Sequence, residues 1–120
     1  MDNAETAHAS QISAAEPGEF APLRLGAMNV WPPVILAPMA GVTNSSFRRI
    51  CRRYGAGLCI SEMIAARPLS ENNDKTWEMA AFAPDERPRS IQLYAVEPKY
   101  VGSAIECLVG EGLVDHVDLN

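Results

Sequence analysis

A short apolar run that ends at a proline constrains the fold of this chain more than any other feature. Residues 34–37 are uninterrupted apolar positions, and Pro38 follows them. A half-exposed strand would alternate polar and apolar residues, so the run predicts a strand buried on both faces, as in a parallel sheet. Pro38 lacks the N–H that a sheet requires, so the chain leaves the sheet there. Gly41 permits a tight turn, and Thr43 or Asn44 can cap the helix that we expect next.

The composition is that of an ordinary globular domain. Of the 120 residues, 48% are hydrophobic and 21% are charged, which favours a single domain. No apolar run approaches the ~18 residues that cross a bilayer, and the N-terminus lacks the pattern of a signal peptide, so we expect a cytoplasmic protein without a membrane partner. Cys51, Cys59 and Cys107 are too widely spaced for a zinc or redox motif. They predict reduced thiols and no metal site.

The net charge of −5 is concentrated at the N-terminus. Residues 1–20 contain four acidic residues and no Lys or Arg, so the remainder of the chain carries a charge of only −1. These residues are rich in Ala, Ser and Glu and lack apolar periodicity, which predicts a disordered leader over 1–20 and a folded domain over 21–120. The charge neither supports nor excludes an RNA partner, because a basic cluster on one face can still bind phosphates.

Two elements flank the apolar strand. Residues 23–25 and 28–31 alternate around Gly26-Ala27 and predict a small hairpin before it. After the turn, four apolar residues recur at the spacing of one helix face, which we expect to lie on the sheet; they are Phe47, Ile50, Cys51 and Tyr54. The other side of this helix carries Arg48, Arg49, Arg52 and Arg53. A solvated face is the simpler interpretation of these arginines, and a contact with RNA phosphates is the alternative.

Three more strands alternate with helices downstream. They are predicted at residues 58–63, 89–94 and 113–120. Asn72, Asn73 or Asp74 can cap the helix that begins near 72–74, and a further helix begins at Pro98 with a buried apolar stripe, which consists of Val101, Ala104, Ile105 and Leu108. Helical crossovers make the strands parallel. Four such repeats predict an α/β fold that corresponds to the N-terminal half of a (β/α)8 TIM barrel, here an incomplete domain because no helix follows the last strand. A flavodoxin-like sheet is the alternative, disfavoured because no Gly-rich dinucleotide fingerprint follows the first strand.

Six blocks of this sequence recur, in order and at the same spacing, in a known family. They are Leu36–Thr43, Phe47-Arg48, Gly55–Gly57, Ser61–Met63, Ile91–Leu93 and Val117–Asn120. Together they resemble the tRNA-dihydrouridine synthases, and the bacterial type B branch most closely. The similarity covers residues 34–120. Asn44 departs from the Asp that is usual in the family, but both residues cap a helix.

The resemblance implies an FMN-dependent oxidoreductase that reduces uridine to 5,6-dihydrouridine in tRNA, with NADPH as the usual electron donor. By the family's motifs, Pro38, Met39 and Ala40 lie against the isoalloxazine ring and Gln92 hydrogen-bonds to its polar edge. The residue types agree, because a flavin needs an apolar wall, backbone donors and an amide that can donate and accept. Core packing by Met39, and a Gln92 amide that satisfies loop carbonyls, are the structural alternatives.

The family's proton donor is not among these residues. In the family, Asp-x-Asn continues to Gly-Cys-Pro, and that cysteine protonates uracil C5 while hydride from the flavin reaches C6. The chain ends at Asn120, so we assign no catalytic residue, place Asn120 near the substrate uracil and expect the isolated chain to be inactive. Glu62 is expected either to orient a loop or ligand or to form an ion pair with an arginine. His116 is expected to be a core or helix-facing residue.

Two other functions remain open from the sequence. Another FMN-dependent barrel enzyme, such as a dihydroorotate dehydrogenase, would share the fold and the flavin but act on a free small molecule. A non-catalytic fragment is the second alternative, because half a barrel leaves a parallel sheet edge unpaired. A Gly-Cys-Pro sequence after Asn120, followed by a basic helical domain, would favour tRNA over either alternative.

Overall fold

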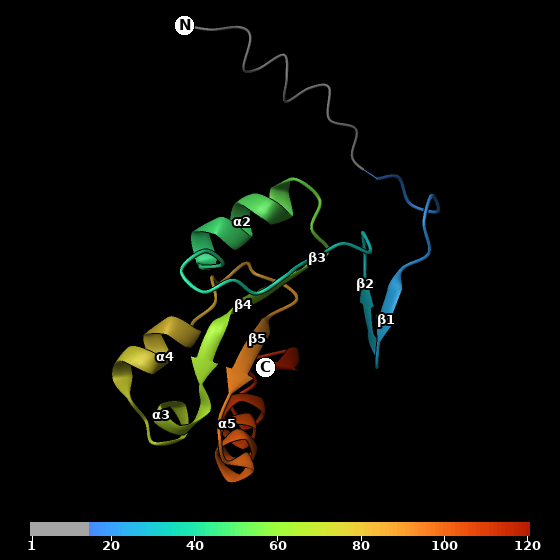
Figure 1. Ribbon diagram of the computed structural model, residues 1–120. Coiled ribbons are helices and arrows are strands. Elements are labelled where there is room, and N and C mark those ends of the chain that lie inside the picture. Colours follow the sequence, from blue (N-terminus) through green and yellow to red (C-terminus); the bar gives the residue numbers. More distant parts are fainter. Residues whose placement is uncertain (1–14) are drawn as a thin grey trace, which may run out of the picture.

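The computed structural model describes residues 15–120 (Figure 1). Most of the predicted leader therefore lies outside the described residues. The part of it that is described, residues 15–20, contains a turn in which Pro17 and Phe20 form an isolated β-bridge. Disorder over residues 1–20 stays a prediction.

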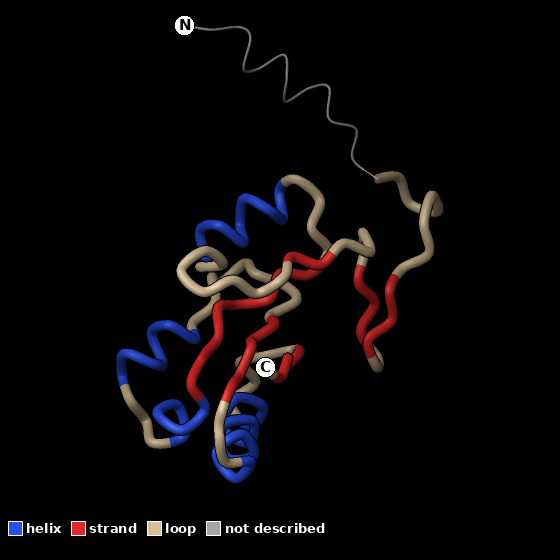
Figure 2. Tube along the Cα trace, viewed as in Figure 1, coloured by secondary structure: helices blue, strands red, loops and turns tan. Residues whose placement is uncertain are grey.

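Strands and helices alternate along the chain from residue 35 onward (Figure 2). In chain order the elements are β1 (Leu23–Leu25), β2 (Met28–Val30), β3 (Ile35–Leu36), α2 (Ser45–Arg53), β4 (Leu58–Ala65), α3 (Ala66–Ser70), α4 (Asp74–Ala80), β5 (Ser90–Tyr94), α5 (Pro98–Gly110) and β6 (His116–Leu119). None of the helices formed by residues 15–120 has both the length and the apolar character that crossing a bilayer demands.

The larger sheet is parallel, and its strands lie side by side in the order β3-β4-β5-β6. Helices connect each strand to the next, which confirms the predicted parallel α/β arrangement. A flavodoxin-like sheet would place its first strand between the second and the third. The order in the described residues differs from that arrangement, because β3 pairs with β4 and β4 with β5.

The main core lies between one face of this sheet and helices α3, α4 and α5. Ile64 of β4 and Ile91 and Leu93 of β5 are fully buried there. The apolar stripe predicted for the helix after Pro98 faces the same core, since Ala104 and Leu108 are buried. Asn73 caps α4 by accepting a hydrogen bond from a backbone N–H, as one of the predicted alternatives required.

The predicted hairpin is confirmed as the antiparallel pair β1–β2, which Figure 1 shows apart from helices α3, α4 and α5. Its Val30 is fully buried against Leu58 and Ile60 at the amino-terminal end of β4. Gly57 is essential to this approach, because a Cβ atom there would lie 1.9 Å from the carbonyl oxygen of Pro32. The hairpin therefore covers the end of the sheet opposite to the turn after β3.

The expected burial of the first strand on both faces is wrong. Val34 is 54% exposed and Ile35 is 40% exposed. The reason is topological, because β3 is an edge strand whose partner among residues 15–120 is β4 alone. Two boundaries also differ: β4 continues past Met63 and leads directly into α3, and the last strand begins only at His116.

The predicted sheet-facing side of α2 is wrong in part. Ile50 and Tyr54 are 53% and 64% exposed, whereas Arg48, which the spacing assigned to solvent, is only 3% exposed. The guanidinium of Arg48 is buried because it finds acceptors: it donates to the Glu86 carboxylate and to the Thr43 carbonyl oxygen. Asn44 caps the helix as predicted.

Candidate functional site

The turn after β3 is closed by Thr43. Its buried hydroxyl oxygen accepts a hydrogen bond from the Met39 N–H at 3.0 Å, and its own N–H donates to the Met39 carbonyl oxygen at 3.0 Å. Gly41 has a φ of +74°, which glycine adopts without the strain that a Cβ atom would cause. The closed turn leaves Met39 41% exposed, with Ala40 exposed beside it. Met39 therefore lies outside the core that residues 15–120 form.

Glu62 ties this turn to the neighbouring strand. The pairing of β4 with β5 shifts between Ile60 and Met63, which is a bulge, and bulges re-aim side chains. The Glu62 carboxylate accepts a hydrogen bond from the Gly41 N–H at 2.5 Å. No ion pair of Glu62 occurs within residues 15–120. Of the two expected roles, orientation of a loop is the one that the structure supports.

Gln92 anchors a second group of polar side chains on β4, β5 and β6. It is 8% exposed, its Nε2 donates to Asp118 Oδ2 at 2.7 Å, and its backbone N–H donates to Ser61 Oγ at 3.1 Å. Directly after β6, Asn120 Nδ2 donates a hydrogen bond of 3.1 Å to Sδ of Met63 on β4. Met63 is the register partner of Gln92, so this contact lies at the level of Gln92 on the neighbouring strand.

The predicted site residues come from three strands of the parallel sheet, and β4 separates β3 from β5. Pro38, Met39 and Ala40 lie in the turn after β3, Gln92 lies on β5, and Asn120 directly follows β6. No hydrogen bond within residues 15–120 joins Met39 to Gln92. Sequence reasoning missed the hydrogen bond between Asp118 and Gln92. Alternation along the strand places Asp118 on the same face as Asn120, but the pairing of Asp118 with Gln92 depends on the register of β6 with β5.

His116 lies on the same face of β6 as Asp118, not on the helix-facing side that we considered for it. Its Nδ1 is 2.7 Å from the hydroxyl oxygen of Ser90, its register partner. Strand periodicity puts Ser90 and Gln92 on one face and the core residues of β5 on the other. His116 is half-buried and hydrogen-bonded at the amino end of this polar face.

The three cysteines are free thiols, and Cys59 is the most deeply buried of them. Cys59 is 1% exposed, and burial raises the pKa of its thiol to about 11. Such a thiol stays protonated at neutral pH and is a poor nucleophile and metal ligand. Within residues 15–120, no three His, Cys, Asp or Glu side chains gather as a metal ion requires.

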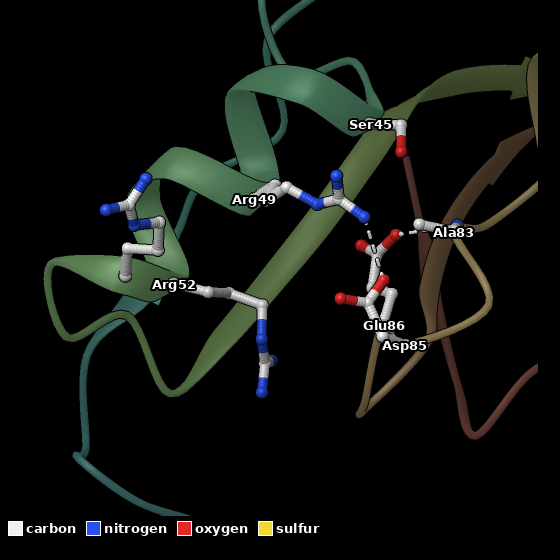
Figure 3. Close-up of a pocket in the computed structure, with 7 residues that line it drawn as sticks. Ser45, Arg49, Arg52, Ala83, Asp85 and Glu86 are labelled. Atoms are coloured by element: carbon white, nitrogen blue, oxygen red, sulfur yellow. Dashed lines mark hydrogen bonds and ion pairs between the residues drawn. The ribbon is translucent and has the colours of Figure 1, made fainter.

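Three arginines of α2, Arg49, Arg52 and Arg53, line a cleft of about 260 Å³ between this helix and the loop before β5. Figure 3 shows Arg49 reaching toward Asp85, to which it donates at 3.0 Å; this bond holds the pKa of the Asp85 carboxyl below its usual value. Arg52 Nη1 is buried without a hydrogen-bond partner among the described residues. Arg48 is buried and pairs with Glu86, so the solvated-face interpretation is wrong for Arg48. Arg49 also pairs with a carboxylate, but its side chain is exposed.

Comparison with known proteins gives a consistent result. The family model described as dihydrouridine synthase matches residues 35–120. A probable tRNA-dihydrouridine synthase of Mycobacterium tuberculosis is 46% identical over 105 residues, an alignment that covers 82% of this chain and 27% of that protein. The tRNA-dihydrouridine synthase B of Shewanella oneidensis is 34% identical over 98 residues, covering 82% of this chain and 30% of that protein.

A third relative, the tRNA-dihydrouridine synthase B of Xanthomonas axonopodis, is 37% identical over 98 residues, with 82% of this chain and 29% of that protein covered. The chain therefore spans between a quarter and a third of the length of these relatives. The family match includes the turn after β3 and every strand of the parallel sheet. On this similarity and on its parallel α/β fold, the chain belongs to the dihydrouridine synthase family.

Proposed function

We propose that this chain is part of a cytoplasmic enzyme that reduces uridine to 5,6-dihydrouridine in tRNA, with FMN as its bound cofactor and NADPH as its electron donor. Membership of the family and the names of the relatives support tRNA uridine reduction. The observation that carries the assignment of a cofactor site is the position of Met39 and Gln92. Met39 lies in the turn at the carboxyl end of β3, and Gln92 is the central residue of β5; the carboxyl edge of a parallel sheet is where α/β folds bind their ligands.

We also propose that the parallel sheet is the first half of a (β/α)8 barrel. Its strands follow one another in chain order, as the strands of such a barrel do. The hairpin β1–β2 packs at the amino-terminal end of β4, where it would cover the bottom of the barrel. Each edge strand, β3 and β6, has one partner among residues 15–120, which leaves both edges available for the remaining strands.

The residues at this end of the sheet fit a flavin. Pro38, Met39 and Ala40 present apolar surface, and within residues 15–120 the Ala40 N–H has no hydrogen-bond acceptor, so it can donate to a ligand. Gln92 offers an amide at a rigid strand position. A flat ring with one apolar face and one polar edge requires this combination of groups.

When bound, FMN supplies the hydride for reduction of the uracil C5–C6 bond. The protein's own residues would position the reactants: the turn at Pro38–Ala40 would support the ring, Gln92 would hold its polar edge, and Asn120 would contact the flipped uracil. The target base has to leave its stack before it can be held face to face with a second ring. By the resemblance, the proton donor is the cysteine of a Gly-Cys-Pro sequence after Asn120.

The proposal is tested by Gln92→Ala in the full-length protein. We expect the purified variant to retain less FMN than the wild type and to form dihydrouridine in tRNA more slowly. Asn29→Ala is the matched control, because it also removes a side-chain amide, from an exposed position on β2, and it should leave both quantities unchanged. Unchanged flavin content together with unchanged tRNA reduction in Gln92→Ala would contradict the assignment.

The same preparation distinguishes the alternatives. A dihydroorotate dehydrogenase would turn over a free small molecule and leave tRNA unmodified, whereas we expect the reverse. For the isolated 120-residue chain we expect no synthase activity, because the proposed proton donor is not part of it. Detectable dihydrouridine formation by a purified sample of that chain would refute this expectation.

A further inference from the structure

Gln92 and Asp118 are register partners on adjacent parallel strands, and their side chains meet. Gln92 Nε2 lies 2.7 Å from Asp118 Oδ2, and Gln92 as a residue is 8% exposed. The backbone of Gln92 is held as well, because its N–H donates to Ser61 Oγ. Gln92 is therefore held to β4 through its backbone N–H and to β6 through its side chain, so the position of the residue and the orientation of its amide are both restricted.

The chemistry of this pair determines which end of the amide faces which way. A primary amide has one end that donates and one that accepts, and an ionised carboxylate can only accept. Asp118 must therefore face Nε2 of Gln92. A residue that could both donate and accept would allow the amide to turn over, and its oxygen and nitrogen would exchange places. With Asp118 bonded to Nε2, the amide oxygen Oε1 of Gln92 makes no bond to β6 and can accept a hydrogen bond from a ligand.

We propose that Asp118 is a positioning residue that orients the Gln92 amide, so that Oε1 presents an acceptor to an N–H group on the edge of the bound ring. The inference rests on the proposed function, in which the N3–H of FMN is that group. Asp118 acts through Gln92. Its role is to fix the orientation of that amide. A variant without the Asp118 carboxylate should therefore change which hydrogen-bonding group faces the ring more than it changes the fold.

The test measures the pH at which N3 of the bound flavin loses its proton in the full-length protein. An acceptor that faces N3–H favours the protonated flavin, whereas a donor in the same place favours the N3 anion. Asp118→Asn keeps the size of the side chain and lets the Gln92 amide turn over. We expect absorbance titration of bound FMN to show N3 ionisation about one pH unit lower in Asp118→Asn than in the wild type, a roughly tenfold weaker hold on the proton.

Two further variants make the test specific. Asp85→Asn removes an exposed carboxylate that binds Arg49 on α2, and it should leave the N3 ionisation unchanged. The double variant Gln92→Glu/Asp118→Asn reverses the sense of the bond, because the amide introduced on β6 can satisfy the carboxylate introduced on β5 only by donating to it. That carboxylate still presents an acceptor to the ring, so the pH of N3 ionisation should return to the wild-type value or rise above it.

The outcomes separate this proposal from the one on which it rests. If Gln92→Ala loses FMN but Asp118→Asn ionises at the wild-type pH, the positioning role is refuted and the cofactor site stands. If Asp118→Asn does not fold, the double variant decides, and failure to reach the wild-type value refutes the role. If the wild type binds no FMN, or Gln92→Ala binds it unchanged, the proposed cofactor site itself is wrong.

Discussion

Arg48 and Glu86 form a buried ion pair that joins the first helix of the parallel unit to the loop before β5. Arg48 Nε lies 2.6 Å from Glu86 Oε1, Nη2 lies 3.1 Å from Oε2, and both side chains are at most 5% exposed. Arg48 also lies over the ring of Phe82, 5.2 Å from its centroid. Two charges buried at this depth are tolerated only because each satisfies the other.

Arg48→Ala in the full-length protein should lower the free energy of unfolding by about 3–5 kcal/mol, because it leaves the Glu86 carboxylate buried and unpaired. Arg49→Ala is the matched control on the same helix. Its ion pair with Asp85 is largely exposed, so we expect a loss below ~1 kcal/mol. Denaturant unfolding measures both, and equal losses for the two variants would show that the pair is not buried in solution.

Gly57→Ala should destabilise the protein because there is no room for a side chain. The new Cβ would lie 1.9 Å from the carbonyl oxygen of Pro32, a backbone atom that cannot move without displacing the hairpin. We expect a loss of about 1–3 kcal/mol in the free energy of unfolding. Gly102→Ala on α5 has nothing within 4 Å and should instead stabilise the helix by up to ~1 kcal/mol. A thermal melt that ranks the two variants in the opposite order would contradict the packing described for Gly57.

Asp115 contributes stability that depends on pH. Arg89 donates to both of its carboxylate oxygens at 3.0 Å, and these hydrogen bonds lower the pKa of the Asp115 carboxyl below its usual value of about 3.9. A group whose pKa is lower in the folded state stabilises the fold above its unfolded pKa and loses this effect as the pH falls through the folded value.

Asp115→Asn should therefore lower the free energy of unfolding at pH 7. The loss should be at most ~1 kcal/mol, because the ion pair with Arg89 is partly exposed. The difference between variant and wild type should shrink below about pH 4. Unfolding curves recorded at several pH values test this, and a difference that grows toward acid would be inconsistent with the ion pair.

Cys59 should be the least reactive thiol of the native protein. With a pKa of about 11, only about one thiol in a thousand is ionised at pH 8, and the side chain is almost completely buried. Alkylation with iodoacetamide at pH 8, read by peptide mass spectrometry, should modify the partly buried Cys51 and Cys107 before Cys59. After denaturation all three should react, and rapid labelling of native Cys59 would contradict its burial.

The order of the elements could be predicted from local patterns. Apolar runs, helix periodicity and caps are properties of neighbouring residues, so they predicted the hairpin, the parallel strands, the Asn44 cap and the buried stripe of α5. The same reasoning was wrong for α2. A periodic pattern depends only on the polarity of residues within one helix. It contains no information on Glu86, which lies 38 residues away and makes the burial of Arg48 possible.

The amino-acid sequence by itself determined the α/β class of this protein, because that class follows from residue types at short spacings. It also indicated the family, and the residues expected at the cofactor site were those that the family resemblance implies. Only the tertiary structure decided how those residues are held. The bond from Gly41 to Glu62 spans 21 residues and depends on a bulge in β4, and the bond from Gln92 to Asp118 spans 26 residues and depends on the register of β5 with β6. Register is a property of two strands together, so no pattern within either strand contains it.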